Sequence, residues 1–225
     1  RPTTTKQRWR AGGKTLLRVS HFHQESISDS LQSGIFEAVA SHLGEYRVLI
    51  FSDFNYGALP PPLVERLRAL GETEGVTMAA DSQSSSQIGD ISRFRGMTLI
   101  TPTEYEARAA TRNFEDGLVV LADQLRQQSQ ADLVLMTLAE DGVFVRGAVP
   151  TGSPPATEQL PALNRNPVDV SGAGDSFLVL ASLALAVSAS IQEAALLGSL
   201  AAALQVSTTG NVPIQSGAIR DLINQ

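Results

Sequence analysis

The residues with the clearest chemical potential lie between positions 171 and 177, where the chain reads Ser-Gly-Ala-Gly-Asp-Ser-Phe. The small residues 172–174 allow a tight turn and leave their backbone N–H groups uncovered. The apolar segment 177–187 that follows is expected to be helical, so these N–H groups would lie at a helix N-terminus, where anions are stabilised. Asp175 can act there as a general base beside a bound anion. The pattern predicts phosphoryl transfer.

Polar residues also follow several predicted strands, at the points where apolar runs end. Asp53, Asp81, the segment 101–106 and Thr137 each come directly after such a run. In a parallel sheet the carboxyl ends of the strands share one edge, and ligands bind there. We therefore expect these side chains to lie at the ligand-binding edge of the sheet.

The elements that must position these residues alternate between apolar runs and amphipathic segments. Strands are predicted at 47–51, 76–80, 97–100, 133–136 and 143–145, and a hairpin at 3–10 and 15–19 joined by a turn at 11–14. Helices are predicted around 35–43, after Pro60, at 118–128, 174–187, 191–206 and 215–223, and after Thr101-Pro102-Thr103, which is expected to supply the N-cap of the helix that carries Glu104 and Glu106. An exposed loop is predicted at 150–159. This alternation predicts an α/β fold with a mostly parallel sheet covered on both faces, built as a single domain over 1–225.

Composition limits the functions that this chain can have. It has 225 residues, of which 43% are apolar and 18% charged, with a formal net charge of −6. Such a charge disfavours binding to nucleic acid or to an anionic membrane surface, so any phosphate site must be local. The apolar stretches are too short to span a membrane. The chain contains no cysteine, which excludes disulfides and fits a cytoplasmic location.

The segment 169–175, Asp-Val-Ser-Gly-Ala-Gly-Asp, resembles the C-terminal motif of the ribokinase-like (PfkB) carbohydrate kinases. Segments 1–6, 52–59 and 95–102 are similar to the kinase domain of bacterial heptose-7-phosphate kinases, which is half of a bifunctional protein in ADP-heptose synthesis. The resemblance implies a ribokinase-like three-layer α/β/α fold and ATP-dependent phosphorylation of a sugar or sugar phosphate. It also implies that a further N-terminal portion, with the first strands and part of the sugar pocket, precedes Arg1.

The resemblance assigns roles residue by residue. Asp175 matches the catalytic base, and Gly172, Ala173 and Gly174 match the anion hole that meets charge on the transferring phosphoryl group. The other matched positions are Glu106 for water-mediated Mg²⁺, Asp169 and Ser171 for a monovalent cation such as K⁺, and Thr103, Thr137, Gly142 and Asn211 for ATP. Arg1 and Lys6 are candidates to hold the phosphate of the substrate, because Arg and Lys are the usual phosphate partners. Kinases of this kind often form homodimers.

Three positions depart from the heptose kinase pattern and leave two hypotheses open. Tyr56 and Gln83 stand where those kinases commonly have lysine, and Thr103 stands where they have asparagine. The first hypothesis is an active kinase with Asp175 as the base. The alternative is a diverged or non-catalytic nucleotide-binding module of a larger sugar-nucleotide enzyme. For Glu106 the competing interpretation is a solvated helix-face glutamate, and for Asp175 a first-turn acid that stabilises the helix dipole.

Overall fold

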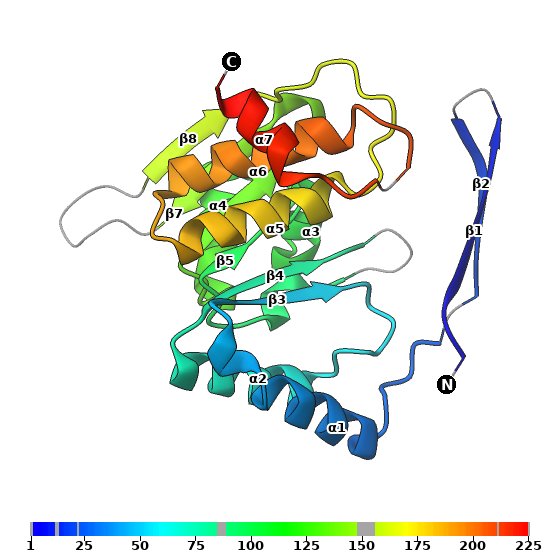
Figure 1. Ribbon diagram of the computed structural model, residues 1–225, viewed down its shortest axis with the longest axis vertical. Coiled ribbons are helices and arrows are strands. Elements are labelled where there is room, and N and C mark those ends of the chain that lie inside the picture. Colours follow the sequence, from blue (N-terminus) through cyan, green and yellow to red (C-terminus); the bar gives the residue numbers. More distant parts are fainter. Residues whose placement is uncertain are drawn as a thin grey trace.

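The computed structural model describes residues 2–11, 14–21, 23–84, 89–147, 156–210 and 212–224. Within them, a six-stranded sheet lies between two layers of helices, and a separate two-stranded hairpin stands beside this body (Figure 1). The order of the strands in the large sheet is β3-β4-β5-β6-β7-β8, which follows the sequence. The mostly parallel three-layer arrangement predicted from the sequence is confirmed.

The elements keep the order expected from the alternation of patterns. The strands are β1 (Thr5–Ala11), β2 (Lys14–His21), β3 (Val48–Asp53), β4 (Thr77–Ser82), β5 (Leu99–Ile100), β6 (Leu133–Thr137), β7 (Val143–Gly147) and β8 (Ala156–Leu160). The helices are α1 (Asp29–Ala40), α2 (Pro61–Glu74), α3 (Glu104–Thr111), α4 (Leu118–Ser129), α5 (Ala173–Ala186), α6 (Ile191–Gln205) and α7 (Ser216–Ile223). Short 3₁₀ helices are η1 (Leu43–Glu45), η2 (Ile91–Arg93) and η3 (Ala139–Asp141).

The central strands are apolar on both faces, because helices cover both sides of the sheet. In β6, Val134 and Met136 enter one hydrophobic core, while Leu135 between them enters the other. Successive side chains of a strand point to opposite faces, so a continuous apolar run fills two cores at once. The helices α2, α3 and α4 line the first core, and α5 and α6 cover the second.

The sheet is parallel from β3 to β6 and antiparallel from β6 to β8. The predicted exposed loop at 150–159 is therefore wrong in its second half, because Ala156–Leu160 forms β8 and pairs with β7. The sequence of this strand, Ala-Thr-Glu-Gln-Leu, lacks the apolar run of the central strands, since it lies at the edge of the sheet. Residues 150–155 of the predicted loop lie outside the described part of the chain.

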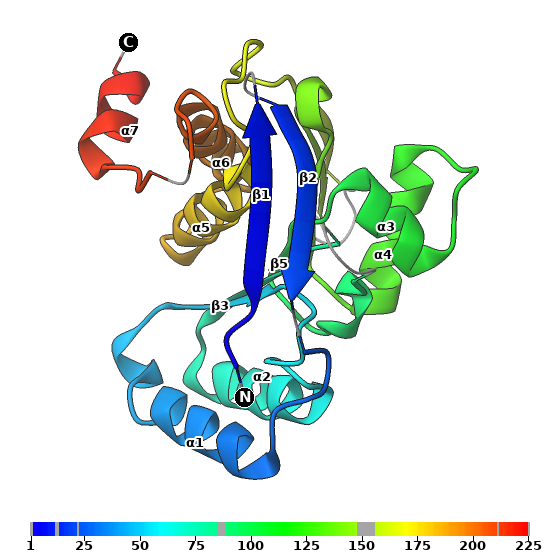
Figure 2. The same ribbon diagram turned by 90° about the vertical axis from the view of Figure 1, so that its right-hand side faces the viewer.

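The antiparallel hairpin of β1 and β2 lies opposite the carboxyl ends of the parallel strands, and Figure 2 shows it crossing in front of this edge. Trp9, Leu16 and Leu17 of the hairpin are exposed. A bond from the N–H of Ile27 to the carbonyl of Gly57 (3.0 Å) ties the segment after the hairpin to the segment after β3. The predicted strand pair is confirmed; residues 12 and 13 of its turn lie outside the described ranges.

Candidate active site

The N-terminus of α5 has the local geometry that the glycine-rich segment predicts. Gly172 precedes the helix with φ 80° and ψ 3°, a left-handed conformation that suits glycine. No side chain caps this helix start, and Asp175 is the acidic residue in its first turn. The N–H of Ala173 donates to the carbonyl of Val170 (3.4 Å), so the backbone N–H groups of Gly174 and Asp175 are left for an anion, beside the half-buried Asp175 carboxylate.

Asp175 contacts the end of β4 across the edge of the sheet. The amide Nε2 of Gln83 donates a hydrogen bond to Asp175 Oδ1, at 3.1 Å. The two residues are 92 positions apart in the sequence. The fold therefore brings a strand end and a helix start together at one point, as expected for a site at the carboxyl edge of a parallel sheet.

Several carboxylates converge at this edge. Burial raises the pKa of Asp81 to about 8, and the charges of Glu106 and Asp175, with a smaller contribution from Asp53, act in the same direction. The backbone hydrogen bond from Ser82 opposes the rise. Like charges gathered in a low dielectric disfavour ionisation, and a bound cation or a proton relieves the repulsion.

This donor set fits a magnesium ion that arrives with nucleotide phosphates. Among the described residues, no group of three or more His, Cys, Asp or Glu is arranged to hold a metal ion by itself. Magnesium commonly keeps several waters and takes only one or two protein carboxylates together with substrate phosphates. The excess negative charge around Asp81 suits such an ion without a complete protein cage.

Glu106 is neither solvated nor free at its carboxylate. It is buried, and its Oε2 accepts bonds from the backbone N–H (2.9 Å) and the hydroxyl (2.8 Å) of Thr103, while its Oε1 accepts from the N–H of Ser84 (2.7 Å). The N–H of Glu106 returns a bond to the Thr103 hydroxyl (3.2 Å), which completes a capping box at the start of α3. The predicted N-cap at Thr103 is confirmed, and the solvated-face interpretation of Glu106 is wrong.

Two of the predicted nucleotide positions lie side by side at the same edge. Thr103 and Thr137 form an isolated parallel bridge, and the N–H of Thr137 donates to the carbonyl of Pro102 (2.8 Å). Gly142 follows η3 at φ 92° and ψ −125°, and a Cβ there would lie 2.0 Å from the carbonyl oxygen of Leu160. Glycine is therefore required at 142 by the backbone itself.

The loop before α5 is joined to the loop after α6. Asp169 Oδ1 accepts from the N–H (3.1 Å) and hydroxyl (2.8 Å) of Ser171, and its Oδ2 accepts from the N–H of Gly210 (3.1 Å). Gln205 adds bonds from its Nε2 to the carbonyls of Ser171 (3.3 Å) and Gly210 (3.0 Å). The structure thus brings the predicted cation residues together with residues 205–210. Asn211, which was predicted for the ATP site, lies outside the described residues.

Lys6 lies in β1 against the segment that follows β3. Its Nζ is 5.1 Å from the ring centroid of Phe54 and 5.1 Å from that of Tyr56, within the range of a cation–π contact. The ammonium group is therefore held at the base of the hairpin and not frayed into solvent. Arg1, the other residue predicted to hold a substrate phosphate, lies outside the described residues.

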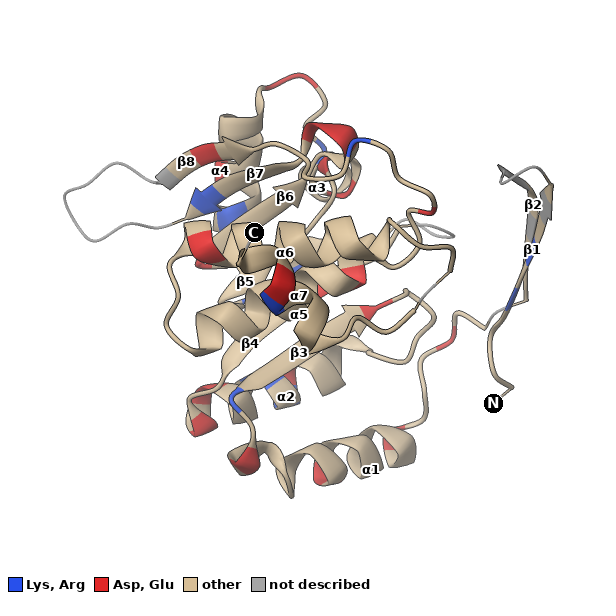
Figure 3. Cartoon of the chain, turned by 45° about the horizontal axis from the view of Figure 1, so that its top comes forward, with Lys and Arg blue, Asp and Glu red and all other residues tan. Residues whose placement is uncertain are grey.

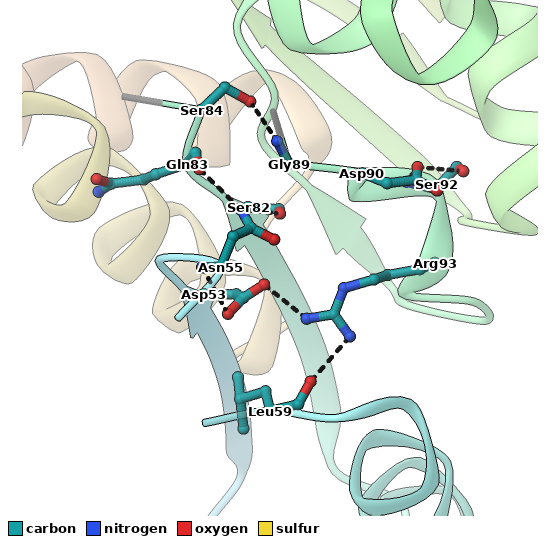
Figure 4. Close-up of polar contacts among 10 residues, drawn as sticks. All are labelled: Asp53, Asn55, Leu59, Ser82, Gln83, Ser84, Gly89, Asp90, Ser92 and Arg93. Atoms are coloured by element: carbon teal, nitrogen blue, oxygen red, sulfur yellow. Dashed lines mark hydrogen bonds and ion pairs between the residues drawn. The ribbon is translucent and has the colours of Figure 1, made fainter. Parts of the chain in front are cut away.

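A polar network at the ends of β3 and β4 supports this edge, and the sequence did not single it out (Figure 4). Arg93 Nη2 lies 2.6 Å from the buried Asp53 Oδ2, and Arg93 Nη1 donates to the carbonyl of Leu59 (3.0 Å). Asn55 donates from its N–H to Asp53 Oδ1 (3.0 Å) and from its Nδ2 to the carbonyl of Gln83 (2.8 Å). The spacing Asp-Phe-Asn after a strand is an Asx-turn pattern that could have indicated the first bond.

Charge over the rest of the molecule is dispersed. Figure 3 shows basic positions scattered among more numerous acidic ones, without a continuous basic face in that view. None of the helices in the described part of the chain is long and apolar enough to cross a bilayer.

A sheet of this topology between two helical layers, with an uncapped glycine-rich helix start and an acid at its carboxyl edge, defines the class of ribokinase-like α/β kinases. The chain belongs to the pfkB family of carbohydrate kinases, whose family model matches residues 17–215.

Relatives of known name are similar to this chain over nearly its whole length. The bifunctional protein HldE of Geotalea uraniireducens is 29% identical over 224 residues, which cover 97% of this chain and 44% of that protein. The bifunctional protein HldE of Rhodospirillum rubrum is 30% identical over 228 residues, covering 100% of this chain and 44% of that protein. The chain thus spans less than half the length of these relatives.

Solved structures agree on the fold. Phosphofructokinase-2 from Escherichia coli, in complex with substrates and products, superposes with a TM-score of 0.73 at 16% identity, covering 98% of this chain and 69% of that chain. Ribokinase from Arabidopsis thaliana, complexed with ribose and ATP, gives a TM-score of 0.66 at 18% identity, covering 90% of this chain and 61% of that chain. The predicted ribokinase-like fold is confirmed.

Proposed function

We propose that this chain is the kinase part of an enzyme that transfers the γ-phosphoryl group of ATP to a hydroxyl of a sugar phosphate of the heptose-7-phosphate kind. The observation that supports it best is the uncapped start of α5, where Gly172 and Asp175 meet the carboxyl edge of the sheet. The similarity to proteins named HldE points to a heptose phosphate as substrate.

In this proposal Asp175 accepts the proton of the attacking hydroxyl. The hydroxyl oxygen forms a bond to the γ-phosphorus as the bond from that phosphorus to the bridging oxygen breaks, and ADP leaves with the electron pair. The N–H groups of Gly172, Ala173 and Gly174 would meet the charge on the transferring group. Since little covalent work is required of the protein, positioning and charge stabilisation would supply most of the rate.

We assign the remaining roles as follows. Thr103, Thr137, Gly142 and Asn211 would line the nucleotide site. Magnesium, when bound, neutralises charge on the phosphates, and Glu106 would hold it through water because its oxygens already accept three protein bonds. Asp169 and Ser171 would support a monovalent cation such as K⁺. Lys6, together with Arg1, would hold the phosphate of the sugar.

The proposal also covers the setting of the enzyme. We place it in the cytoplasm, where ATP and sugar phosphates are available, and assign it a homodimeric assembly. The net charge of −6 disfavours nucleic acid as a partner.

The test is ATP consumption by the full-length protein that contains this chain, with a panel of heptose and hexose phosphates. We expect turnover with at least one heptose phosphate and its loss in Asp175→Asn. The matched control is Asp221→Asn, an exposed acid in α7, on another helix than Asp175. Equal turnover by wild type and Asp175→Asn would show that the base is wrongly assigned. ATP binding by calorimetry without transfer to any sugar would favour the non-catalytic nucleotide-binding module instead.

A further inference from the structure

We propose that Gln83 is a positioning residue for Asp175, which fixes the carboxylate through one oxygen and leaves the other for the substrate hydroxyl. The inference rests on the proposed role of Asp175 as the base. It gives a function to a side chain that stands where the heptose kinase pattern has a lysine.

The contact itself has the geometry that this role needs. Gln83 Nε2 donates to Asp175 Oδ1 at 3.1 Å, and both side chains are only half-buried, so a substrate can reach the pair. One oxygen of Asp175 is engaged by the amide. The second oxygen is the one that can accept a proton from a hydroxyl.

A neutral donor suits a base better than a cation does. A lysine at 83 would pair with Asp175 as an ion pair and favour its charged form more strongly, which would make the carboxylate a weaker proton acceptor. The Gln83 amide donates a hydrogen bond to Asp175 and adds no charge. Gln83 therefore orients Asp175 without neutralising it.

The neighbourhood makes such an orienting contact necessary. The charges of Glu106 and Asp175 both act on the Asp81 carboxyl, so Asp175 lies close enough to Asp81 for charge on one to disfavour charge on the other. A carboxylate on the first turn of a helix can rotate away from its neighbours. The bond from Gln83 opposes this rotation.

Gln83 can act in this way because its own backbone is pinned on both sides. Its N–H donates to the carbonyl of Asp53 (2.9 Å), and its carbonyl accepts from Asn55 Nδ2 (2.8 Å). Asp53 is in turn held by Arg93, and Figure 4 shows the Gln83 side chain extending away from this network. Its amide therefore starts from a fixed point at the end of β4.

Asn55 is closely packed against Gly89. A Cβ on Gly89 would lie 2.4 Å from Asn55 Nδ2, and the N–H of Gly89 donates to the hydroxyl of Ser84 (3.0 Å). Ser84 and Gly89, the described residues on either side of 85–88, thus help to hold Asn55 in place against the Gln83 backbone.

The test compares Gln83→Met and Gln83→Glu in the full-length enzyme, with the sugar phosphate that it turns over best. Methionine keeps the length of the side chain and removes the donor, so we expect kcat to fall about 10-fold to 100-fold, the usual range for a hydrogen bond to a charged group. The KM values for ATP and sugar should change less than about 2-fold, since neither substrate loses a contact. Glutamate has the shape of glutamine but repels Asp175, so its kcat should fall further.

The matched control is Gln128→Met, because Gln128 also donates through its side chain, to Ser92 (2.9 Å) and to the carbonyl of Ala110 (3.2 Å), away from Asp175. It should keep the wild-type kcat. A wild-type kcat in Gln83→Met, or a loss that appears only in KM, would overturn the inference. So would a Gln83→Glu enzyme as active as wild type.

A double-mutant comparison separates this inference from the proposed function. If Gln83 acts through Asp175, Gln83→Met should cause no further loss in an Asp175→Asn background; an equal further loss would mean that it acts elsewhere. Full turnover by Asp175→Asn would instead show that the base assignment itself has failed. When the Asp175→Asn rate is below detection, the test depends on the single variants: kcat should fall from wild type to Gln83→Met and fall again to Gln83→Glu.

Discussion

Asp53 and Arg93 form the most deeply placed ion pair of the site region, with side-chain exposures of 3% and 22%. Arg93→Met would leave the Asp53 charge buried without its partner, which typically costs about 3–5 kcal/mol. We expect urea unfolding to show a loss of this size. The double variant Asp53→Asn with Arg93→Met should recover part of it, because the stranded charge is then removed.

A surface pair provides the control for that experiment. Arg68 pairs with Glu65 on an exposed face of α2, and Arg68→Met should cost less than about 1 kcal/mol. Equal losses in Arg93→Met and Arg68→Met would contradict the importance of burial at Asp53.

Asp81 predicts a pH dependence of stability. Its pKa in the folded protein, about 8, lies above the ordinary 3.8, so the folded state holds this proton more tightly than the unfolded state does. The resulting stabilisation is complete below about pH 4 and is lost as the pH rises through 8. Asp81→Asn imitates the protonated acid and should escape this loss.

We therefore expect the Tm advantage of Asp81→Asn over wild type to grow between pH 5 and pH 8, without magnesium or nucleotide. A difference of one full bound proton changes the free energy of unfolding by about 1.4 kcal/mol per pH unit. For a chain of this size, each kcal/mol shifts Tm by roughly 2–4 °C. Calorimetry at the two pH values measures it. A Tm difference that stays constant with pH would show that Asp81 is not the titrating group.

At the scale of elements, two capping boxes of the same design offer a matched pair. Thr103 with Glu106 begins α3, and Ser190 with Glu193 begins α6. Thr103→Ala and Ser190→Ala should each cost about 1 kcal/mol of unfolding free energy. Only Thr103→Ala should also raise the KM for ATP, because only α3 starts at the carboxyl edge of the sheet beside Thr137.

Chemical denaturation and steady-state kinetics on both variants test this difference. An unchanged KM for ATP in Thr103→Ala, with the stability loss present, would limit Thr103 to capping.

Local sequence patterns predicted most of these elements, and the failures have physical causes. The Thr103 cap and the Gly172 turn depend on residues next to each other in the chain, so their types and spacing are informative. The pairing of β8 depends on a neighbouring strand that its own polar sequence does not reveal. The partners Asp53 and Arg93 are 40 positions apart, and the Gln83 to Asp175 bond spans 92, so no local pattern could relate them.

On the scale of the whole molecule, the hairpin and the layered body should differ in stability. A two-stranded ribbon with Trp9, Leu16 and Leu17 exposed has little apolar cover, whereas β4 to β6 are buried between helices. We expect the amides of β1 and β2 to exchange hydrogen orders of magnitude faster than those of the central strands. Hydrogen exchange followed by mass spectrometry measures this.

Addition of the sugar phosphate should slow exchange around Lys6, if this residue holds the phosphate as proposed. Exchange in the hairpin as slow as in β6 would contradict the expected difference in stability.

The sequential order of the strands in the sheet also bears on how the chain folds. Each strand from β3 to β8 lies next to its neighbour in sequence, so the sheet can grow by adding each strand, with any helix that connects it, to the strand before it. The bond between Gln83 and Asp175 cannot form until α5 has docked on the end of β4. The sheet can therefore be largely assembled before the chain gains its aligned base, and catalytic competence should be the last property to appear during refolding.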